Sequence, residues 1–262
     1  KRVAVIRGKV FTRDNIPLPD VRITILNHPE FGSTLSRSDG QFDMAVNGGG
    51  VLTIRYEKDN YITAQRQVDV PWQDFAILPD VVIIPYDSNK TEVTLTPASP
   101  MQVARGSEIR DADGTRQATL VIPAGVTAQL QDGTPISNLT VRATEYTVGT
   151  NGPQAMPAIL PPNVGYTYCV EYSADEAIAA GSKSVIFSQP IYHYVENFIG
   201  FPVGGIVPMG YYDYDLAAWI PSRNGRVIKI LKINDGLAEL DVNGTNVAAD
   251  MGTLASLGIT DS

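Results

Sequence analysis

The chain is poor in cysteine and in basic charge, and it has no long apolar run. Its 262 residues include a single cysteine, Cys169, which excludes an intrachain disulfide and leaves a hydrophobic core to hold the fold. Lys and Arg number 20 against 28 for Asp and Glu, and this net charge of -8 gives no attraction for DNA, RNA or an anionic membrane. No apolar run approaches the length of a membrane span. We therefore expect neither a nucleic-acid partner nor a membrane span.

The first residues also lack the apolar region of a signal peptide. They read KRVAVIRGKV, in which charged residues interrupt the apolar ones. Two interpretations follow: a soluble cytosolic chain, or a fragment whose targeting signal was removed.

Glycine and proline are abundant, at 23 and 18 residues, which favours many short elements joined by turns. We predict an all-β fold class, with two β-sandwich-like domains in tandem and little helix. One helical turn is expected at Ser173–Ala180, where Ser173 and Glu176 have the capping-box spacing. The stretch Phe187–Leu231 holds five tyrosines and Trp219 among prolines and glycines, a pattern typical of strands and corners rather than helix.

Apolar and polar residues alternate with period two in the first 97 residues, as in half-buried antiparallel strands. Turn residues separate these strands, including Pro17–Asp20, Ser38–Gly40 and Asn47–Gly50. A small β-sandwich follows from this order of strands and turns. The expected inward-facing residues are Val21, Ile23 and Ile25; Phe42, Met44 and Val46; and Leu52, Ile54 and Tyr56.

The segments GKVFTRDNIPLPDVRITI, STLSRSDGQFDMAV and VLTIRYEKDNYITAQRQV resemble the carboxypeptidase regulatory-like domain, a transthyretin-like sandwich. The positions that carry the resemblance are Gly8, Val10, Pro17, Leu18, Asp39, Gly40, Phe42 and Tyr61. Two departures, Asp20 and Asn60, both fall in turns. The resemblance implies a first domain at residues 1–97.

After a polar stretch at 87–100, segments of alternating apolar and polar residues return, and turns and a proline-rich loop separate these segments. The expected strands lie at Ala118–Ile122, Leu139–Val148, Tyr166–Tyr172 and Val185–Val195. The segment TLVIPAGVTAQLQDGTPISNLTVRATEY resembles the start of ZU5-like β domains. This resemblance implies a second domain at residues 98–232, with the Tyr/Trp/Pro-rich stretch at its end.

A broader resemblance covers nearly the whole chain. The motifs ENF, GFPVG, GYYD and NGRV within Glu196–Val227 are similar to the region ahead of the shell in bacterial YD-repeat (Rhs-type) proteins, relatives of the teneurins. The resemblance implies a secreted or cell-surface bacterial protein whose shell encloses a toxin or other cargo. Residues 233–262 would then be a linker toward an absent downstream region, and the chain a piece of a larger protein.

Few residues suggest chemistry. His28 and His193 are the two histidines, and neither has a metal-binding spacing such as HExxH. Cys169, in YTYCVEY, is typical of a small buried strand residue, and a Cys/His dyad with His193 is the weaker alternative because no orienting partner is evident. We expect no catalytic residue, no metal site and no cofactor.

The acidic residues offer two further candidates. Asp213 and Asp215 flank Tyr214, with Glu196 upstream, so a paired-carboxylate glycosidase site is one interpretation, and solvated strand faces or turn caps are the commoner one. The Asp241-x-Asn243-x-Thr245 loop has the alternating oxygens of a calcium loop but lacks its later glycine and glutamate. Weaker matches are the Asp111-x-Asp113-Gly114 turn and the glycosylation sequons at Asn89, Asn138 and Asn243.

The sequence leaves two functions of different class. The first is a non-catalytic structural or interaction segment that packs against, or helps to close, the downstream YD-repeat shell of the same polypeptide. The alternative is an adhesin or carbohydrate-binding module that takes a cell-surface protein or glycan. Exposed rings would favour binding, and rings buried against a neighbour would favour the structural role. The rings in question are Tyr211, Tyr212, Tyr214 and Trp219.

Overall fold

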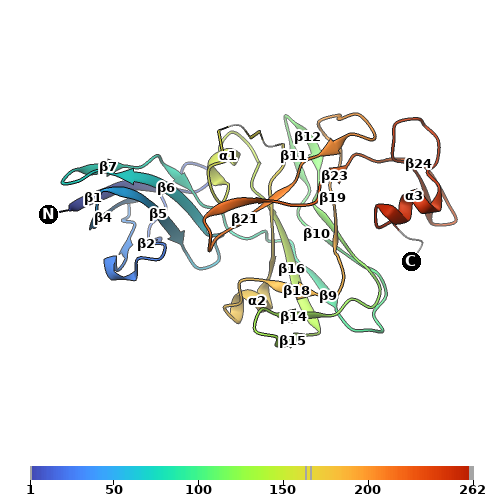
Figure 1. Cartoon of the computed structure of the whole chain (residues 1–262), viewed down its shortest axis with the longest axis horizontal. Coiled ribbons are helices and arrows are strands. Elements are labelled where there is room, and N and C mark those ends of the chain that lie inside the picture. The colour runs from blue at the N-terminus through green and yellow to red at the C-terminus, as the bar shows by residue number, and fades with distance from the viewer. Residues whose placement is uncertain (1, 163, 166, 260–262) are drawn as a thin grey trace. The chain divides into compact units, whose positions relative to one another are not determined.

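The computed structural model describes residues 2–162, 164–165 and 167–259, and the fold is all-β as predicted (Figure 1). In the described residues the helices are short: a 3-10 turn η1 (Pro29–Phe31), α1 (Gly152–Ala155), α2 (Asp175–Ala179) and α3 (Met251–Ser256). None of these is long and apolar enough to span a membrane.

The chain divides into two compact units, each of which is discontinuous in sequence. Unit 1 comprises Lys1–Ser88, Ala143–Tyr172 and Tyr212–Trp219. Unit 2 comprises Asn89–Arg142, Ser173–Tyr211 and Ile220–Ser262. The domain ranges inferred from composition and resemblance, 1–97, 98–232 and 233–262, stay predictions. Residues 233–262, expected as a linker, include the end of strand β24 (Lys229–Asn234), all of β25 (Leu237–Asp241) and α3.

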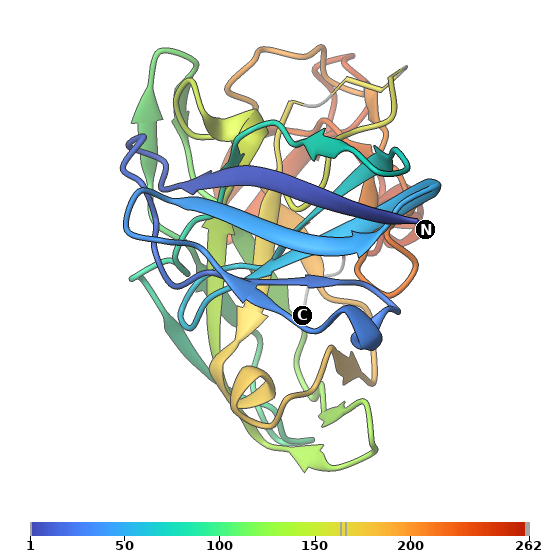
Figure 2. The same cartoon turned by 90° about the vertical axis from the view of Figure 1, so that its left-hand side faces the viewer.

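The first 88 residues of unit 1 form a sandwich of two sheets (Figures 1 and 2, blue to cyan). In one sheet β1 (Val3–Phe11) lies antiparallel to β4 (Gln41–Asn47) and parallel to β7 (Phe75–Ile77) and β8 (Val81–Val82). The other sheet has the order β3 (Thr34–Leu35), β2 (Arg22–Ile25), β5 (Gly50–Glu57) and β6 (Ala64–Val70).

All nine residues expected to face inward are buried, with exposed fractions between 0% and 8%. They join Ile6 and Val10 of β1 in one hydrophobic cluster that draws on both sheets. The period-two prediction is therefore confirmed, because successive side chains of a strand point to opposite faces and only one face meets the other sheet.

Backbone conformation explains the turn residues. Gly40 has a φ of +77°, and a Cβ there would lie 2.5 Å from the Val10 carbonyl oxygen, so only glycine fits. The two departures from the resemblance, Asp20 and Asn60, have φ of +58° and +66°. Asp and Asn tolerate this left-handed region better than other side chains do, so both substitutions preserve their turns.

Unit 2 is built from small sheets around a second hydrophobic cluster that includes Val93, Ile122, Leu139 and Val141. One sheet has the order β10 (Gln102–Arg105), β13 (Thr119–Ile122) and β19 (Tyr192–Tyr194). A second has β15 (Pro135–Ile136), β14 (Ala128–Leu130) and β18 (Val185–Phe187). A third has β17 (Val170–Ala174), β16 (Asn138–Glu145) and β9 (Thr91–Thr94), in which the last residues of β16 and the first of β17 belong to unit 1.

The remaining strands pair two by two. These pairs are β11 (Ile109–Asp111) with β12 (Gly114–Arg116), β20 (Ile206–Val207) with β23 (Gly225–Arg226), β21 (Gly210–Asp213) with β22 (Ala218–Pro221), and β24 with β25. The stretch Phe187–Leu231 thus consists of short strands and turns, as predicted. Of the expected strand Tyr166–Tyr172, Tyr166 lies outside the described residues.

The predicted helical turn is present as α2, but its predicted cap is wrong. The N-cap is Ala174, which makes no side-chain cap bond, because Ser173 is still part of strand β17. Glu176 does not close a capping box either. Its carboxylate accepts hydrogen bonds from the backbone N–H and hydroxyl of Thr140, each at 2.8 Å, and ties α2 to β16.

Candidate interaction site on the N-terminal sandwich

Strand β6 is the last strand of its sheet, and its free side is covered by two segments from much later in the chain. The backbone N–H of Gln65 donates to the Pro157 carbonyl oxygen at 2.7 Å. An uncovered edge strand offers unpaired backbone groups to any passing strand, so this cover also protects the sandwich. We call the contact of residues 63–67 with segments 154–159 and 212–219, all within unit 1, the β6 seat.

Arg66 anchors the first of these segments. Its guanidinium is buried, with 6% of the residue exposed, and it donates to the carbonyl oxygens of Gln65 (2.7 Å), Pro157 (3.2 Å), Gln154 (2.6 Å) and Met156 (3.2 Å). Burial lowers the pKa of Arg66, yet arginine keeps its charge in proteins. The planar fork of donors therefore organises the irregular backbone around α1.

Gln65 and the tyrosines hold the second segment. The hydroxyl of Tyr212 donates to Gln65 Oε1 at 2.7 Å, and Gln65 Nε2 donates to the Tyr214 carbonyl oxygen at 2.9 Å. The hydroxyl of Tyr214 donates to the Thr63 carbonyl oxygen at 2.8 Å. Both ends of a fully buried amide are thus satisfied by the returning chain.

The rings of the returning segment pack against one another. Tyr212 meets Tyr214 and Trp219 in edge-on contacts, with centroids 5.1 and 5.3 Å apart. The indole N–H of Trp219 donates to the Ile159 carbonyl oxygen at 3.2 Å. Tyr211, in contrast, is 53% exposed. Three of the four rings in question are therefore engaged by neighbours within the fold.

An apolar cluster underlies the seat. Ile62, Val82 and Ile84 of the sandwich contact Tyr146 and Met156 from the middle of the chain. These side chains are at most 3% exposed. Burial of this apolar surface stabilises the contact by roughly 25 cal/mol for each Å² removed from water.

A carboxyl group lies at the edge of this cluster. The hydroxyl of Tyr146 donates to Glu171 Oε2 at 3.0 Å. Burial raises the pKa of Glu171 to about 7, although the hydrogen bond from Tyr146 opposes the rise. Burial also raises the pKa of the Cys169 thiol to about 12, and the charges of Glu171 and Glu145 add to that rise.

Neither partner of the proposed Cys/His dyad has the properties of an activated pair. A nucleophilic cysteine needs a lowered pKa, and that of Cys169 moves the other way. His193 lies in β19 opposite Leu120, and burial lowers its pKa to about 4. The two residues belong to different units.

The acidic candidates bond to protein groups. Asp213 Oδ1 accepts from the backbone N–H groups of Asp215 and Leu216, both at 2.9 Å, which makes it a turn cap. Glu196 accepts from the backbone N–H of Gln117 at 2.6 Å in unit 2. A glycosidase pair of Asp213 and Asp215 would need carboxylates open to a sugar. The Asp213 carboxylate instead caps its own turn, to which Asp215 contributes a backbone N–H.

The Asp241 loop is stabilised from within. Asp241 is fully buried, and its carboxylate accepts from the backbone N–H groups of Asn243 (3.0 Å), Gly244 (2.8 Å) and Asn246 (2.7 Å). Desolvation raises its pKa, but these donors outweigh that effect and lower the pKa overall. Among the described residues, no group of three or more His, Cys, Asp or Glu side chains is placed to hold a metal ion.

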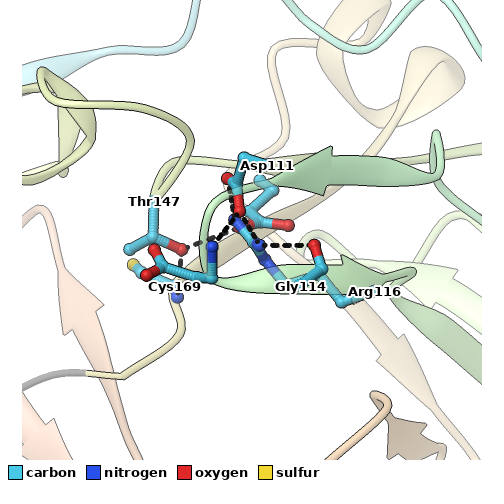
Figure 3. A network of polar contacts seen from close by, with 7 residues as sticks. Asp111, Gly114, Arg116, Thr147 and Cys169 are labelled. Carbon is cyan, nitrogen blue, oxygen red and sulfur yellow. Dashed lines mark hydrogen bonds and ion pairs between the residues drawn. The ribbon is translucent and has the colours of Figure 1, made fainter. Parts of the chain in front are cut away.

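In the Asp111 turn the carboxylate pairs with an arginine. Arg116, only 1% exposed, donates to both carboxylate oxygens of Asp111 at 2.8 and 2.9 Å and approaches the Gly114 carbonyl oxygen (Figure 3). Its guanidinium also lies 4.6 Å from the ring centre of Phe198. The turn is thus a charge-paired hairpin.

The amide groups of the three sequon asparagines are all hydrogen-bonded within the protein. Asn89 donates to the carbonyl oxygens of Arg105 and Gly106, Asn138 accepts from Thr94, and Asn243 accepts from Thr245.

Sequence reasoning missed Gln65, Arg66, Tyr146 and Glu171. Residues 65–67 read QRQ, which suggests a solvated strand, whereas the structure buries Ala64, Gln65 and Arg66 in succession. Three consecutive buried residues require cover on both faces of a strand. Ala64 packs in the sandwich core, whereas Gln65 and Arg66 are covered by residues more than 85 positions away.

Comparisons with known proteins agree with the sandwich. Residues 1–83 match the family described as "Teneurin TTR-like domain". Teneurin-4 of Mus musculus is 42% identical over 79 residues, which is 30% of this chain and 3% of that protein. Teneurin-m of Drosophila melanogaster is 39% identical over 95 residues, which is 36% of this chain and 3% of that protein. The chain thus spans about 3% of the length of the curated relatives it matches.

Solved structures align only loosely. A streptococcal ancillary pilin covers 53% of this chain and 47% of its own, with 10% identity and a TM-score of 0.27. The alignment with a putative carbohydrate binding protein from Bacteroides uniformis covers 73% of this chain and 78% of that protein, with 14% identity and a TM-score of 0.26. Scores this low support no argument about function. The sequence matches carry the conclusion: the N-terminal part of this chain is teneurin-like, with a TTR-like sandwich as its first element.

Proposed function

We propose that the chain is a non-catalytic structural segment of a large, secreted or cell-surface, teneurin-like protein. In this proposal the TTR-like sandwich is a docking platform that fixes later parts of the polypeptide. The observation that carries it is the β6 seat, where Gln65 and Arg66 bind two segments from 88 to 149 residues further along the chain. Buried polar networks whose hydrogen bonds are satisfied rigidify a fold and specify its geometry, as a docking platform requires.

The proposal extends to a partner and a source. By the YD-repeat resemblance, the platform packs against the downstream shell of the same polypeptide, and that shell encloses a toxin or other cargo in a bacterial protein. The motifs within Glu196–Val227 and the teneurin-like first domain support this partner and source.

The alternative role, an adhesin or carbohydrate-binding module, requires an open aromatic face. Tyr212, Tyr214 and Trp219 are hydrogen-bonded and make edge-on ring contacts within unit 1, which leaves Tyr211 as the exposed ring of the four. A sugar face built from those rings is therefore disfavoured.

A binding experiment separates the two roles. The 262-residue chain is immobilised and offered, in parallel, the downstream region encoded by its natural gene and a glycan array. We expect capture of the downstream region, together with slower amide hydrogen exchange over residues 187–231. Glycan capture without downstream binding or new protection would reject the structural role and support the alternative.

A further inference from the structure

Glu171 is a half-buried carboxyl group at a contact between distant segments. It lies on β17, at the end of the middle segment of unit 1, and its hydrogen-bond partner is the Tyr146 hydroxyl at 3.0 Å. Among the described residues, no Lys, Arg or His forms an ion pair with it. A carboxylate in such a place loses hydration without gaining a counter-charge.

The titratable groups around Glu171 are neutral or acidic. Tyr146 follows β16, Cys169 immediately precedes β17, and Tyr214 comes from the turn between β21 and β22. Burial raises the pKa of all three, and the charge of Glu171 adds to that rise, so each of them faces Glu171 closely enough to interact. Further groups face these three rather than Glu171 itself: Arg66, Tyr86, Tyr212 and Glu145.

The same tyrosines hold the returning segments in place. Tyr146 belongs to the apolar cluster under the β6 seat, and Tyr214 bonds to the Thr63 and Gln65 positions of the sandwich. A charge that appears on Glu171 therefore acts directly on the side chains that fix the contact.

We propose that Glu171 makes the β6 seat a pH-sensitive contact, which the neutral carboxyl group holds closed and its ionisation loosens. This inference deepens the proposed docking role and rests on it. It assigns to the platform a response near neutral pH, where ordinary carboxylates no longer titrate.

The direction follows from proton binding. Burial raises the pKa of Glu171 from 4.5 to about 7, so between these values the folded chain keeps a proton that the unfolded chain has released. Stability from this group is fully present below pH 4.5, falls as pH rises toward about 7, and is lost above that value. The seat is accordingly tighter in mild acid than in mild base.

Trp219 provides a local reporter, because its indole lies in the seat and bonds to Ile159. The second tryptophan, Trp72, is 61% exposed, and Trp72→Phe leaves Trp219 as the single emitter. In this background, acrylamide quenching of Trp219 is compared at about pH 5 and about pH 8. We expect quenching to be about two- to threefold stronger at the higher pH, because local opening exposes the ring.

Two variants test the assignment. Glu171→Gln keeps an acceptor for Tyr146 and cannot ionise, so quenching should become the same at both pH values. Tyr146→Phe removes the hydrogen bond that favours the charged form, so the quenching midpoint should move to higher pH. Glu92→Gln, at an exposed carboxylate of unit 2, is the control and should keep the pH dependence of the parent.

The outcomes are distinct. The proposed pH sensitivity is rejected if Glu171→Gln retains the pH dependence of the parent. It is also rejected if quenching in the parent does not change with pH while Trp219 stays protected. Neither result contradicts the docking role. If Trp219 is freely quenched at every pH, the seat does not form and both proposals fail. Should Glu171→Gln fail to fold, an unmoved midpoint in Tyr146→Phe would still reject the proposed pH sensitivity.

Discussion

The side-chain amide of Gln65 donates to the backbone carbonyl oxygen of Tyr214 at 2.9 Å, across 149 residues of sequence. The contact places a polar side chain of the first sandwich at the centre of the fold of unit 1. The contribution of this contact to stability can be measured by comparison, because Gln65 is buried and Gln67, on the same strand, is exposed.

Gln65→Leu should lower the free energy of unfolding by about 2 to 4 kcal/mol, because it leaves two partly buried partners unsatisfied, the Tyr212 hydroxyl and the Tyr214 carbonyl. Urea denaturation gives the difference. Gln67→Leu is the control: Gln67 is exposed, its bond to Ala217 is 3.3 Å long, and the expected change is within about 0.5 kcal/mol. Equal effects of the two substitutions would contradict this account of the seat.

Arg66→Met should lower the free energy of unfolding by about 3 to 5 kcal/mol, since it removes the donors of three buried hydrogen bonds and one partly buried one. Arg66→Lys should recover only part of the loss, because an ammonium group cannot reproduce the planar fork. Thermal unfolding of both variants measures the difference. A methionine variant as stable as the parent would show that the guanidinium has no structural role.

Gly8→Ala should destabilise the sandwich by about 1 to 3 kcal/mol through overpacking. Gly8 pairs with Phe42 across β1 and β4, and a Cβ at this position would lie 2.9 Å from the Phe42 ring. A double-mutant cycle with Phe42→Leu tests the cause, because the smaller side chain should reduce the cost of the alanine. Strict additivity would place the strain elsewhere.

Tyr56→Phe should raise stability by about 1 kcal/mol. Tyr56 is fully buried and packs edge-on against Phe42, and its hydroxyl has no hydrogen-bond partner among the described residues. Removing that hydroxyl removes the desolvation free energy that an unpaired buried hydroxyl costs. Calorimetry of the variant provides the measurement, and a loss of stability would mean that the hydroxyl is bonded.

The Cys169 thiol should react with a disulfide reagent at about pH 8 roughly a hundredfold more slowly in the folded chain than in urea. Burial both shields the sulfur and raises its pKa to about 12, which leaves little thiolate. The rate of thiol labelling is followed by absorbance. Equal rates in the two states would show that the thiol is accessible and ionised.

The sandwich could be predicted because its signal is local. Alternation placed Ile23, Phe42 and Ile54 on the inner faces, and all three are fully buried. Turn chemistry at Gly40 was equally visible, since a positive φ selects glycine. The TTR-like match over residues 1–83 agrees with this part of the sequence interpretation.

The β6 seat could not be predicted, because the residues that bury Gln65 and Arg66 lie far from them in the sequence. Gln65 and Arg66 belong to a polar run, and only contacts with residues 154 to 214 show why they are buried. The capping-box prediction at Ser173 failed for a related reason: pairing with β16 extends β17 past that serine, so the helix starts later. Tertiary context overrode a correct local pattern.

The discontinuity of unit 1 also has a consequence for synthesis. Strand β6 ends at Val70, but the segment that completes its cover ends at Trp219. At translation rates of about 5 to 20 residues per second, the nascent sandwich waits roughly 7 to 30 s with that side uncovered. During this interval the emerging chain is open to wrong strand pairing, so its yield should depend on chaperones that shield nascent β edges.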